Sequence, residues 1–240
     1  MYRDRRKVRL GDVDRRGRLR LDATARVLQD IATDDAADAD LDRRFGWLVR
    51  RTLIDTVRPA VLGEWVDVAT WCTGTGRSWA ERRSSIRGER GAHVDTVSLW
   101  VQIDVRTGRP SRLAADFVGA YGEAADGRTV SARLALPTAP DVTGGTPWVV
   151  RRSDIDPFGH VNNAANWEYL EQIAVLDESS ERIGRAEMEY LHPVTDDMTT
   201  TIVVRRHDPS DRADSGREID AWLVADEIVV SAARWTPGGG

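Results

Sequence analysis

Several stretches in the first half of the chain have the residue pattern of β-strands. Residues 48–57, 64–73, 78–87 and 93–104 are rich in β-branched and aromatic side chains, which are typical of strands. Glycine-containing segments between them, "TGTGRSW" (73–79) and "RGERG" (87–91), predict hairpin turns. Residues 22–39 predict a helix ahead of these strands.

The second half shows a similar order of elements. Trp167, Leu170 and Ala174 fall on one face of a helix, and residues 164–178 contain neither proline nor glycine. The strand-like segments that follow are "AEMEYLHPV" (186–194), "TTTIVVRR" (199–206), "EIDAWLVAD" (218–226) and "EIVVSAARW" (227–235). One helix beside a run of strands predicts an α+β unit, with an antiparallel sheet covered by the helix on one face.

An internal repeat relates the two halves. At a shift of 142 residues, "LGDVDRRGRLRLDATARVLQDIA" (10–32) aligns with "RSDIDPFGHVNNAANWEYLEQIA" (152–174), and Asp14, Gly17 and Leu28 fall on Asp156, Gly159 and Leu170. At a shift of 134, residues 53–71 align with 187–205. Two blocks in the same order indicate two copies of one structural unit.

The junction between the copies is visible in the composition. "LPTAPDVTGGTPW" (136–148) holds three prolines and two glycines, which is typical of a linker. We therefore expect a first unit at 1–135, a linker at 136–147 and a second unit at 148–240. Two such units are expected to pack together as an internal pseudo-dimer.

Composition narrows the class of protein. The net charge of −5 over 240 residues argues against general nucleic-acid binding. No apolar run is long enough for a membrane span, and the charged N-terminus does not resemble a signal peptide, so a cytoplasmic location is expected. Cys72 is the only cysteine, which excludes an internal disulfide, and we expect it to be buried in a strand. His93, His192 and His207 lack the spacing of metal ligands, so neither a metal nor a cofactor is expected.

Arginine supplies nearly all the positive charge, because Lys7 is the only lysine. The arginines cluster near residues 3–9, 82–90 and 151–152. A solvated surface is the simpler interpretation of these clusters, and docking of an acidic protein or a phosphate group is the alternative.

The segment "SDIDPFGHVNN" (153–163) concentrates the candidate chemistry. Pro157 and Gly159 predict a tight turn, and Asn162 or Asn163 can cap the helix that follows. An aspartate such as Asp156 can orient a nearby histidine such as His160, which leaves the other ring nitrogen free to move a proton. The N–H groups at the helix start are suited to stabilising an oxyanion.

The alternative is that these residues only form a turn into a helix. The first copy argues against this alternative, because it keeps Asp14 and Gly17 but has Arg18, Arg20 and Leu21 in place of His160, Asn162 and Asn163. The turn therefore forms without histidine or asparagine at these positions. We expect one functional site in each chain, located in the second unit.

The pattern D-x-x-G-H-V-N-N, followed by a helix containing "YLE", resembles the hotdog-fold thioesterases. The two-unit layout, with "VLQDIATDDA", "SLWVQIDVRTGRPSRL" and "MEYLHPV", resembles the acyl–acyl-carrier-protein (acyl-ACP) thioesterases across most of the chain. This resemblance implies two tandem hotdog units, each a long helix wrapped by a curved antiparallel sheet. It also implies hydrolysis of a fatty-acyl thioester to the free fatty acid, within fatty acid biosynthesis.

The resemblance assigns catalytic roles to Asp156 and His160, but two other positions differ from the plant pattern. Phe158 replaces the family's asparagine, and Pro193 lies where a family acid is expected. Val194 replaces a cysteine once considered the nucleophile. Glu171 matches a helix acid of single-unit hotdog enzymes, or it is a plain surface charge.

The expected site therefore consists of Asp156 and His160, with Gly159, Val161, Asn162, Asn163 and Glu171 contributing substrate binding, the oxyanion site or the helix cap. Asp156 acts either as a general base on water or as a nucleophile, and the acyl chain is expected in an apolar tunnel between helix and sheet. The partner is an acyl carrier protein or a coenzyme A thioester, and homodimer formation is left open. The alternatives are a non-catalytic acyl-binding hotdog protein and a hydratase. The hydratase is disfavoured because its histidine lies five residues after the aspartate instead of four.

Overall fold

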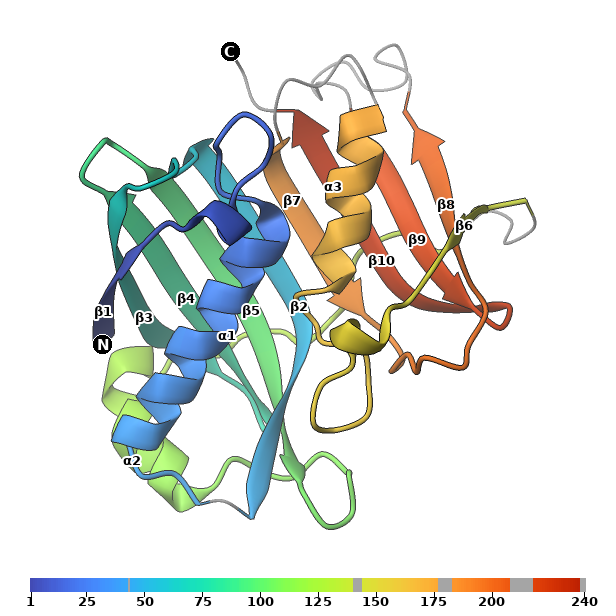
Figure 1. Cartoon of the computed structure of the whole chain (residues 1–240). Coiled ribbons are helices and arrows are strands. Elements are labelled where there is room, and N and C mark those ends of the chain that lie inside the picture. Colours follow the sequence, from blue (N-terminus) through green and yellow to red (C-terminus); the bar gives the residue numbers. More distant parts are fainter. Residues whose placement is uncertain (43, 140–143, 177–182, 208–217, 238–240) are drawn as a thin grey trace. The chain divides into compact units, whose positions relative to one another are not determined.

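The structure is a computed structural model that describes residues 1–42, 44–139, 144–176, 183–207 and 218–237. The chain divides into two compact units, Met1–Leu134 and Ala135–Gly240. Each unit is an antiparallel sheet with a helix on one face, so the α+β class predicted from the sequence is confirmed (Figure 1).

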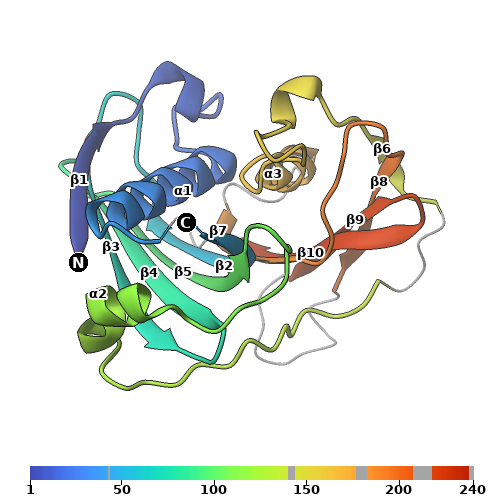
Figure 2. The same cartoon turned by 90° about the horizontal axis from the view of Figure 1, so that it is seen from below.

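The first unit contains α1 (Leu21–Asp38), α2 (Ala115–Ala125) and five strands. The strands are β1 (Tyr2–Lys7), β2 (Phe45–Arg58), β3 (Trp65–Thr75), β4 (Trp79–Gly88) and β5 (His93–Asp104), and a 3-10 turn, η1 (Leu10–Asp12), precedes α1. The strands pair in the order β1-β3-β4-β5-β2. Figure 2 shows α1 lying along one face of this sheet, and α2 lies near the C-terminal end of α1.

The second unit contains α3 (Asn166–Leu176) and five described strands. The strands are β6 (Thr146–Trp148), β7 (Ile183–Tyr190), β8 (Thr200–Arg206), β9 (Ile219–Ala225) and β10 (Ile228–Pro237), and the 3-10 turn η2 (Arg152–Asp154) precedes α3. The strands pair in the order β7-β10-β9-β8-β6, with every pair antiparallel. A hydrogen bond between the hydroxyls of Tyr169 and Ser231, and one from Trp167 to Tyr190, hold α3 on one face of the sheet.

The predicted helices and strands are present, with ends shifted by a few residues. The part of the expected second helix beyond Leu176 lies outside the described residues. The sequence analysis did not predict α2, whose two glycines weaken its intrinsic helix propensity. Tertiary packing stabilises it instead, because Phe117 and Tyr121 pack with Cys72 and Ala80.

The expected linker contains ordered structure at both described ends. Glu189 accepts hydrogen bonds from the amides of Ala135 (2.6 Å) and Leu136 (3.2 Å), and Trp222 donates to the carbonyl of Pro137 over 2.9 Å. At the other end, Thr146–Trp148 forms β6, so this strand begins inside the segment expected to be a linker. Proline and glycine content does not predict these contacts, because they depend on side chains far along the chain.

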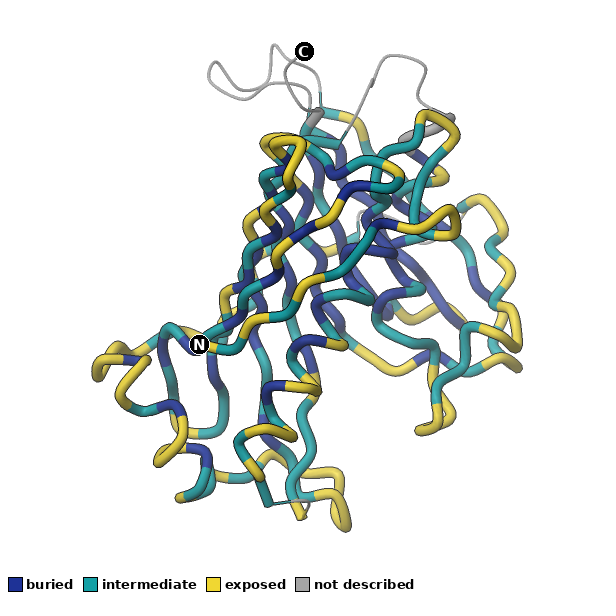
Figure 3. Tube along the Cα trace, turned by 60° about the vertical axis from the view of Figure 1, so that its left-hand side comes forward, coloured by how far each residue is buried: buried dark blue, intermediate teal, exposed yellow. Residues whose placement is uncertain are grey.

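Burial follows the alternation expected of sheets with one covered face. Along β3 every second residue from Val66 to Gly74 is buried, and Figure 3 shows such buried positions as dark blue segments separated by exposed ones. In the second unit the largest fully buried side chains include Trp167, Tyr169, Trp222 and Trp235. Cys72 is buried in β3 as predicted, and burial raises the pKa of its thiol.

The repeat is also present in the backbone hydrogen bonds. The amide of Leu19 donates to the carbonyl of Ala60 over 2.8 Å, and the amide of Val161 donates to the carbonyl of Val194 over 2.7 Å. The donors are related by the shift of 142 and the acceptors by the shift of 134. Both repeat blocks therefore meet in the same hydrogen bond in each unit.

Candidate active site

The turn at residues 156–160 is organised by Asp156. Its amide donates to the carbonyl of His160 (2.8 Å), and its carbonyl accepts from the amide of Gly159 (3.0 Å). Its Oδ1 accepts from the amides of Phe158 (2.8 Å) and His160 (3.4 Å). Gly159 has φ of +81°, a left-handed conformation that side chains disfavour, so glycine is the residue suited to this corner.

Backbone hydrogen bonds on both sides hold the turn in place. Val161 forms an isolated antiparallel bridge with Ile155, and its amide donates to the carbonyl of Val194 in the loop between β7 and β8. The amide of Asn162 donates to the carbonyl of Asp154 over 2.8 Å. Val161 therefore contributes its main chain, which fixes the position of His160 beside it.

The two asparagines have different roles in the turn before α3. Oδ1 of Asn162 accepts from the amide of Ala164 over 2.8 Å, and its carbonyl accepts from Ala165 over 2.9 Å. Asn162 therefore holds the turn that precedes α3, whose first residue is Asn166, and the helix cap expected of Asn162 or Asn163 stays a prediction. Among the described residues, none accepts a hydrogen bond from the backbone N–H or the side-chain amide of Asn163. Those donors are available to a bound oxygen atom.

Buried aromatic residues support this turn from below. Tyr190 donates from its hydroxyl to the carbonyl of Asn163 over 3.3 Å and accepts from Nε1 of Trp167 over 2.8 Å. Trp167 is fully buried. The sequence analysis did not assign either residue to the site, although both lie in segments it had marked as helix and strand. These two hydrogen bonds fix the position of Asn163 relative to the sheet.

Asp156 and His160 lie on the same turn, but the structure does not join their side chains. Oδ1 of Asp156 accepts from two backbone amides, and among the described residues no group donates to its Oδ2. The imidazole of His160 is exposed and likewise has no described hydrogen-bond partner. The expected orientation of the His160 ring by the Asp156 carboxylate is absent from this structure, so one carboxylate oxygen and both ring nitrogens are available for other groups.

The corresponding turn of the first unit has its aspartate fully engaged. Oδ1 of Asp14 accepts from the amides of Arg16 (2.8 Å) and Arg18 (2.9 Å), as Oδ1 of Asp156 does in the second unit. Oδ2 of Asp14 accepts from Nε of Arg18 over 2.9 Å. Arg18 corresponds to His160, so the two units share one turn and differ in whether the second carboxylate oxygen is occupied.

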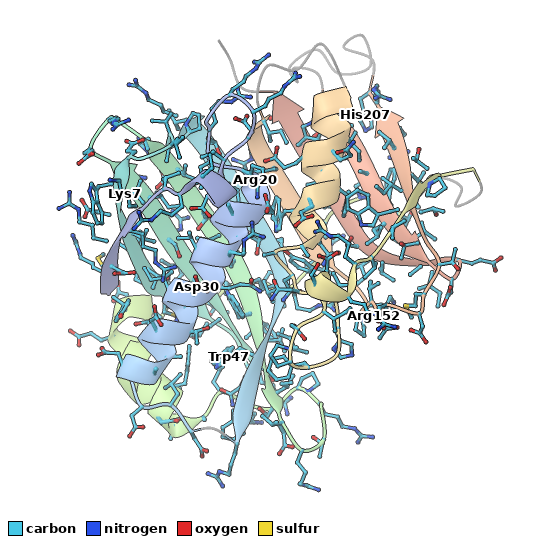
Figure 4. The ribbon with its side chains drawn as sticks, viewed as in Figure 1. Lys7, Arg20, Asp30, Trp47, Arg152 and His207 are labelled. Carbon is cyan, nitrogen blue, oxygen red and sulfur yellow. The ribbon has the colours of Figure 1, made fainter. Side chains whose placement is uncertain are left out.

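Charged groups surround the start of the site without entering the turn. Arg151 donates to Asp154 and also to Glu168, and the hydrogen bond that Asp154 accepts raises the pKa of the Arg151 guanidinium. Arg152 is fully exposed on η2, near the N-terminal end of α3 (Figure 4). These contacts tie η2 to the first turn of α3. Arg152 takes no part in them, and its Nε lies 3.8 Å from Oδ2 of Asp196 in a solvent-exposed ion pair.

The two departures from the family pattern occupy exposed positions. Phe158 is 82% exposed at the tip of the turn, and Pro193 is exposed one residue before Val194. Glu171 is partly exposed on α3, and it takes part in at least one polar or electrostatic interaction. Within the described ranges, no group of three or more His, Cys, Asp or Glu side chains is arranged to hold a metal ion.

The fold and this turn together define a class, the hotdog-fold thioesterases, and comparison with known proteins identifies the family. Residues 1–121 match the acyl-ACP thioesterase N-terminal domain, and residues 140–236 match the acyl-ACP thioesterase C-terminal domain. The chain belongs to the acyl-ACP thioesterase family.

Relatives and solved structures agree with this family. An uncharacterized protein of Mycobacterium tuberculosis is 33% identical over 199 residues, which cover 82% of this chain and 79% of that protein. The 12:0-ACP thioesterase from Umbellularia californica has a similar structure, with a TM-score of 0.79 and 21% identity over 98% of this chain and 96% of its own. A Lactobacillus plantarum protein gives a TM-score of 0.82 at 22% identity, covering 100% of this chain and 97% of that one. These structures show that the fold is shared.

No helix in the described part of the chain is both long and apolar enough to cross a membrane.

Proposed function

We propose that the protein hydrolyses the thioester of an acyl-ACP and releases the free fatty acid, with Asp156 and His160 as the catalytic residues. One observation supports this proposal more than any other. The second unit repeats the turn of the first unit but leaves Oδ2 of Asp156 unoccupied where Arg18 binds Oδ2 of Asp14. A carboxylate held by two amides, with its other oxygen available, is suited to accept a proton from water.

The proposed reaction uses few groups. Asp156 removes a proton from a water molecule, whose oxygen attacks the thioester carbonyl carbon. The N–H groups of Asn163 stabilise the resulting oxyanion, because they are preorganised donors at the start of α3. The C–S bond then breaks, and protonated His160 supplies a proton to the departing thiolate. A single turnover in labelled water distinguishes this route from direct attack by Asp156 to give an anhydride that water opens at the Asp156 carbonyl carbon. General-base attack places the label in the fatty acid, whereas the direct route places an unlabelled Asp156 oxygen in the fatty acid and the label in the Asp156 carboxylate.

The acyl carrier is part of the proposal. Arg152 is fully exposed beside the site, and an acidic carrier protein offers charges that pair with such an arginine. Coenzyme A thioesters are the alternative substrates. Hydrolysis of one acyl chain presented on both carriers, measured at low and high salt, separates these substrates, because pairing between charged surfaces weakens with salt.

A second candidate function is acyl-thioester binding without hydrolysis. Phe158 is exposed where the family pattern has a polar residue, and no hydrogen bond joins the described side chains of Asp156 and His160. Binding of acyl thioesters without thiol release at any chain length favours this function over catalysis.

The decisive experiment is the Asp156→Asn variant. The amide oxygen of asparagine still accepts from Phe158 and His160, so the turn is retained, but the proton acceptor is lost. We expect hydrolysis to fall by roughly 10²–10⁴-fold with little change in thermal stability. Asp14→Asn is the matched control, because it alters the same turn in the first unit and should leave hydrolysis unchanged. Equal rates for the parent and Asp156→Asn proteins would exclude Asp156 from catalysis.

A further inference from the structure

The helix-facing surface of the first unit's sheet contains a band of polar side chains. Two neighbouring rows cross the four strands β3, β4, β5 and β2 in register. One row is Thr70, Ser84, Thr96 and Ile54, and the next is Cys72, Arg82, Ser98 and Thr52. We call the five hydroxyl residues and Arg82 the hydroxyl band. All five hydroxyl residues are buried.

The hydroxyl band lies beneath α1. Asp35 of α1 accepts a hydrogen bond from Arg82, and Tyr121 of α2 donates to the carbonyl of Asp35 over 3.1 Å. The rows on either side are mostly apolar: Val68, Ile86, Val94 and Thr56 on one side, and Thr75, Ala80, Trp100 and Val49 on the other. Hydroxyl groups are therefore concentrated in the middle of this surface.

The second unit shows that the fold does not require these polar groups. At the shift of 134, the corresponding rows are Met188, Ala233, Ala221 and Val204, and Ala186, Trp235, Ile219 and Arg206. None of these eight residues carries a hydroxyl group, and the buried Nε1 of Trp235 has no described hydrogen-bond partner. A sheet of the same architecture therefore forms without hydroxyl groups at these eight positions.

Part of the hydroxyl band already satisfies its hydrogen bonds within the protein. Ser84 donates to Oγ1 of Thr70 over 2.9 Å, Thr70 donates to the carbonyl of Arg83, and Thr96 donates to the carbonyl of Ser84. Buried polar groups are normally paired in this way.

The β5–β2 end of the band differs, because it has donors without acceptors. Thr52 and Ser98 share one hydrogen bond of 3.2 Å, so one of their two hydroxyl hydrogens has no acceptor among the described residues. Trp100 lies two residues beyond Ser98 on the same side of β5, and its buried Nε1 has no described partner either. An unpaired buried donor is costly to retain, so a bound group that accepts hydrogen bonds explains both.

We propose that this end of the first unit's sheet binds an acyl chain bearing a hydroxyl or oxo oxygen along its length, in preference to a plain hydrocarbon chain. The acyl chain itself rests on the proposed function. The oxygen of the chain accepts from Trp100 Nε1–H and from the spare hydroxyl of the Thr52–Ser98 pair. A plain chain leaves both donors unpaired and therefore binds less tightly.

The test compares chains of equal length with and without an oxygen. Plain, 3-hydroxy, mid-chain hydroxy and mid-chain oxo acyl-ACP thioesters are assayed for hydrolysis, and the matching free fatty acids are assayed for binding by calorimetry. We expect at least one oxygenated chain to exceed the plain chain roughly tenfold in kcat/KM and in affinity, the size of effect produced by one buried unpaired donor. Plain chains that are bound and cleaved as well as every oxygenated chain would overturn the proposal.

Variants locate the effect in the hydroxyl band. Thr52→Val/Ser98→Ala/Trp100→Phe removes the donors while nearly preserving side-chain volume, and it should reduce the oxygenated-to-plain ratio to about one without lowering thermal stability. Trp100→Phe alone, which removes a single unpaired N–H, provides the same test if the triple variant does not fold. Ser231→Ala, which removes a buried hydroxyl from the second unit's sheet, is the control and should keep the parental ratio. A ratio unchanged in both Trp100 variants contradicts the proposal.

Failure of this proposal is distinguishable from failure of the proposed function. If no thioester is cleaved, the proposed function fails, and fatty-acid binding still measures the preference for oxygen. If plain and oxygenated thioesters are cleaved equally well, the proposed function holds and this inference fails.

Discussion

Arg18 donates from Nε to Oδ2 of Asp14 over 2.9 Å, and no described group makes the equivalent contact with Asp156. The two aspartates occupy equivalent positions in equivalent turns, and each uses Oδ1 to bind two backbone amides. The difference lies in one residue of each turn, Arg18 or His160. The same turn therefore occurs twice. In the first unit both carboxylate oxygens of the aspartate are bound, and in the second unit one oxygen is available.

His160→Arg should give the turn of the second unit the arginine–aspartate contact that the turn of the first unit already has. The guanidinium would reach Oδ2 of Asp156 as Arg18 reaches Asp14, so hydrolysis should fall at least 100-fold because both proton-handling groups are lost. Thermal stability should be equal or slightly higher, since a partly exposed ion pair contributes about 0.3–1 kcal/mol. Steady-state hydrolysis and a thermal melt measure the two effects.

The reverse substitution, Arg18→His, is the control for that variant. It should lose a comparable amount of stability and retain parental hydrolysis. Parental hydrolysis in the His160→Arg protein would show that the available oxygen of Asp156 is not used.

Gly159→Ala should destabilise the candidate site through backbone strain. Gly159 has φ of +81°, and a Cβ added there meets no atom within 4 Å, so the cost comes from conformation and not from a clash. We expect a loss of about 1–2 kcal/mol in the free energy of unfolding, with reduced hydrolysis because the turn that holds Asp156 is distorted. Gly11→Ala tests the same change without a positive φ or a clash and should be nearly neutral. Equal unfolding free energies for the two variants would contradict this explanation.

Cys72 should be chemically silent in the folded protein. It is buried in β3, its Sγ lies 3.6 Å from the carbonyl oxygen of Gly74, and burial raises the pKa of its thiol. Burial is the dominant effect and suppresses the reactive thiolate. We expect a disulfide reagent to label no thiol in the native protein and one in denaturant, and Cys72→Ala to retain hydrolysis. Rapid labelling of the native protein, or loss of hydrolysis in the Cys72→Ala variant, would be inconsistent with a buried structural cysteine.

Asp220 should make the stability of the second unit fall as the solution becomes acidic. Burial raises the pKa of this carboxyl, but hydrogen bonds from Arg234 (2.6 Å), His207 (2.7 Å) and Arg205 (3.2 Å) outweigh burial, so its pKa lies below the ordinary value. His207 lies at the end of β8 (Figure 4). A lowered folded-state pKa gives stabilisation that is present above about pH 4 and is lost as the pH falls towards the folded value.

Urea unfolding between pH 7 and pH 3 measures this dependence. The parent should lose stability steeply below about pH 4. Asp220→Asn should be destabilised by about 2 kcal/mol at pH 7 and should vary less with pH, because Arg234 and Arg205, which are partly exposed, lose their charged hydrogen-bond partner. Asp67→Asn, at an exposed carboxylate, should follow the parent. An acid dependence that is identical in the parent and Asp220→Asn proteins would exclude Asp220 as its source.

The sequence by itself determined the local architecture and the position of the candidate site. Strand and helix segments were predictable because burial of one face imposes a regular spacing on the residues of each element. The glycine at 159 was predictable because few other residues tolerate its backbone conformation. The repeat identified His160, beside the shared aspartate, as a difference between the two units, since equivalent positions that need not match for folding are free to differ.

The tertiary structure decided which groups within that segment are occupied. It showed that Asn162 holds the turn before α3, and that the carboxylate of Asp156 binds amides and not the His160 ring. It also brought the hydroxyls of four strands into one band, although they are separated by tens of residues along the chain. The packing of the two units as a pseudo-dimer stays a prediction. Hydrogen bonds and strand register depend on distances between residues far apart in sequence, and local patterns hold no information about those distances.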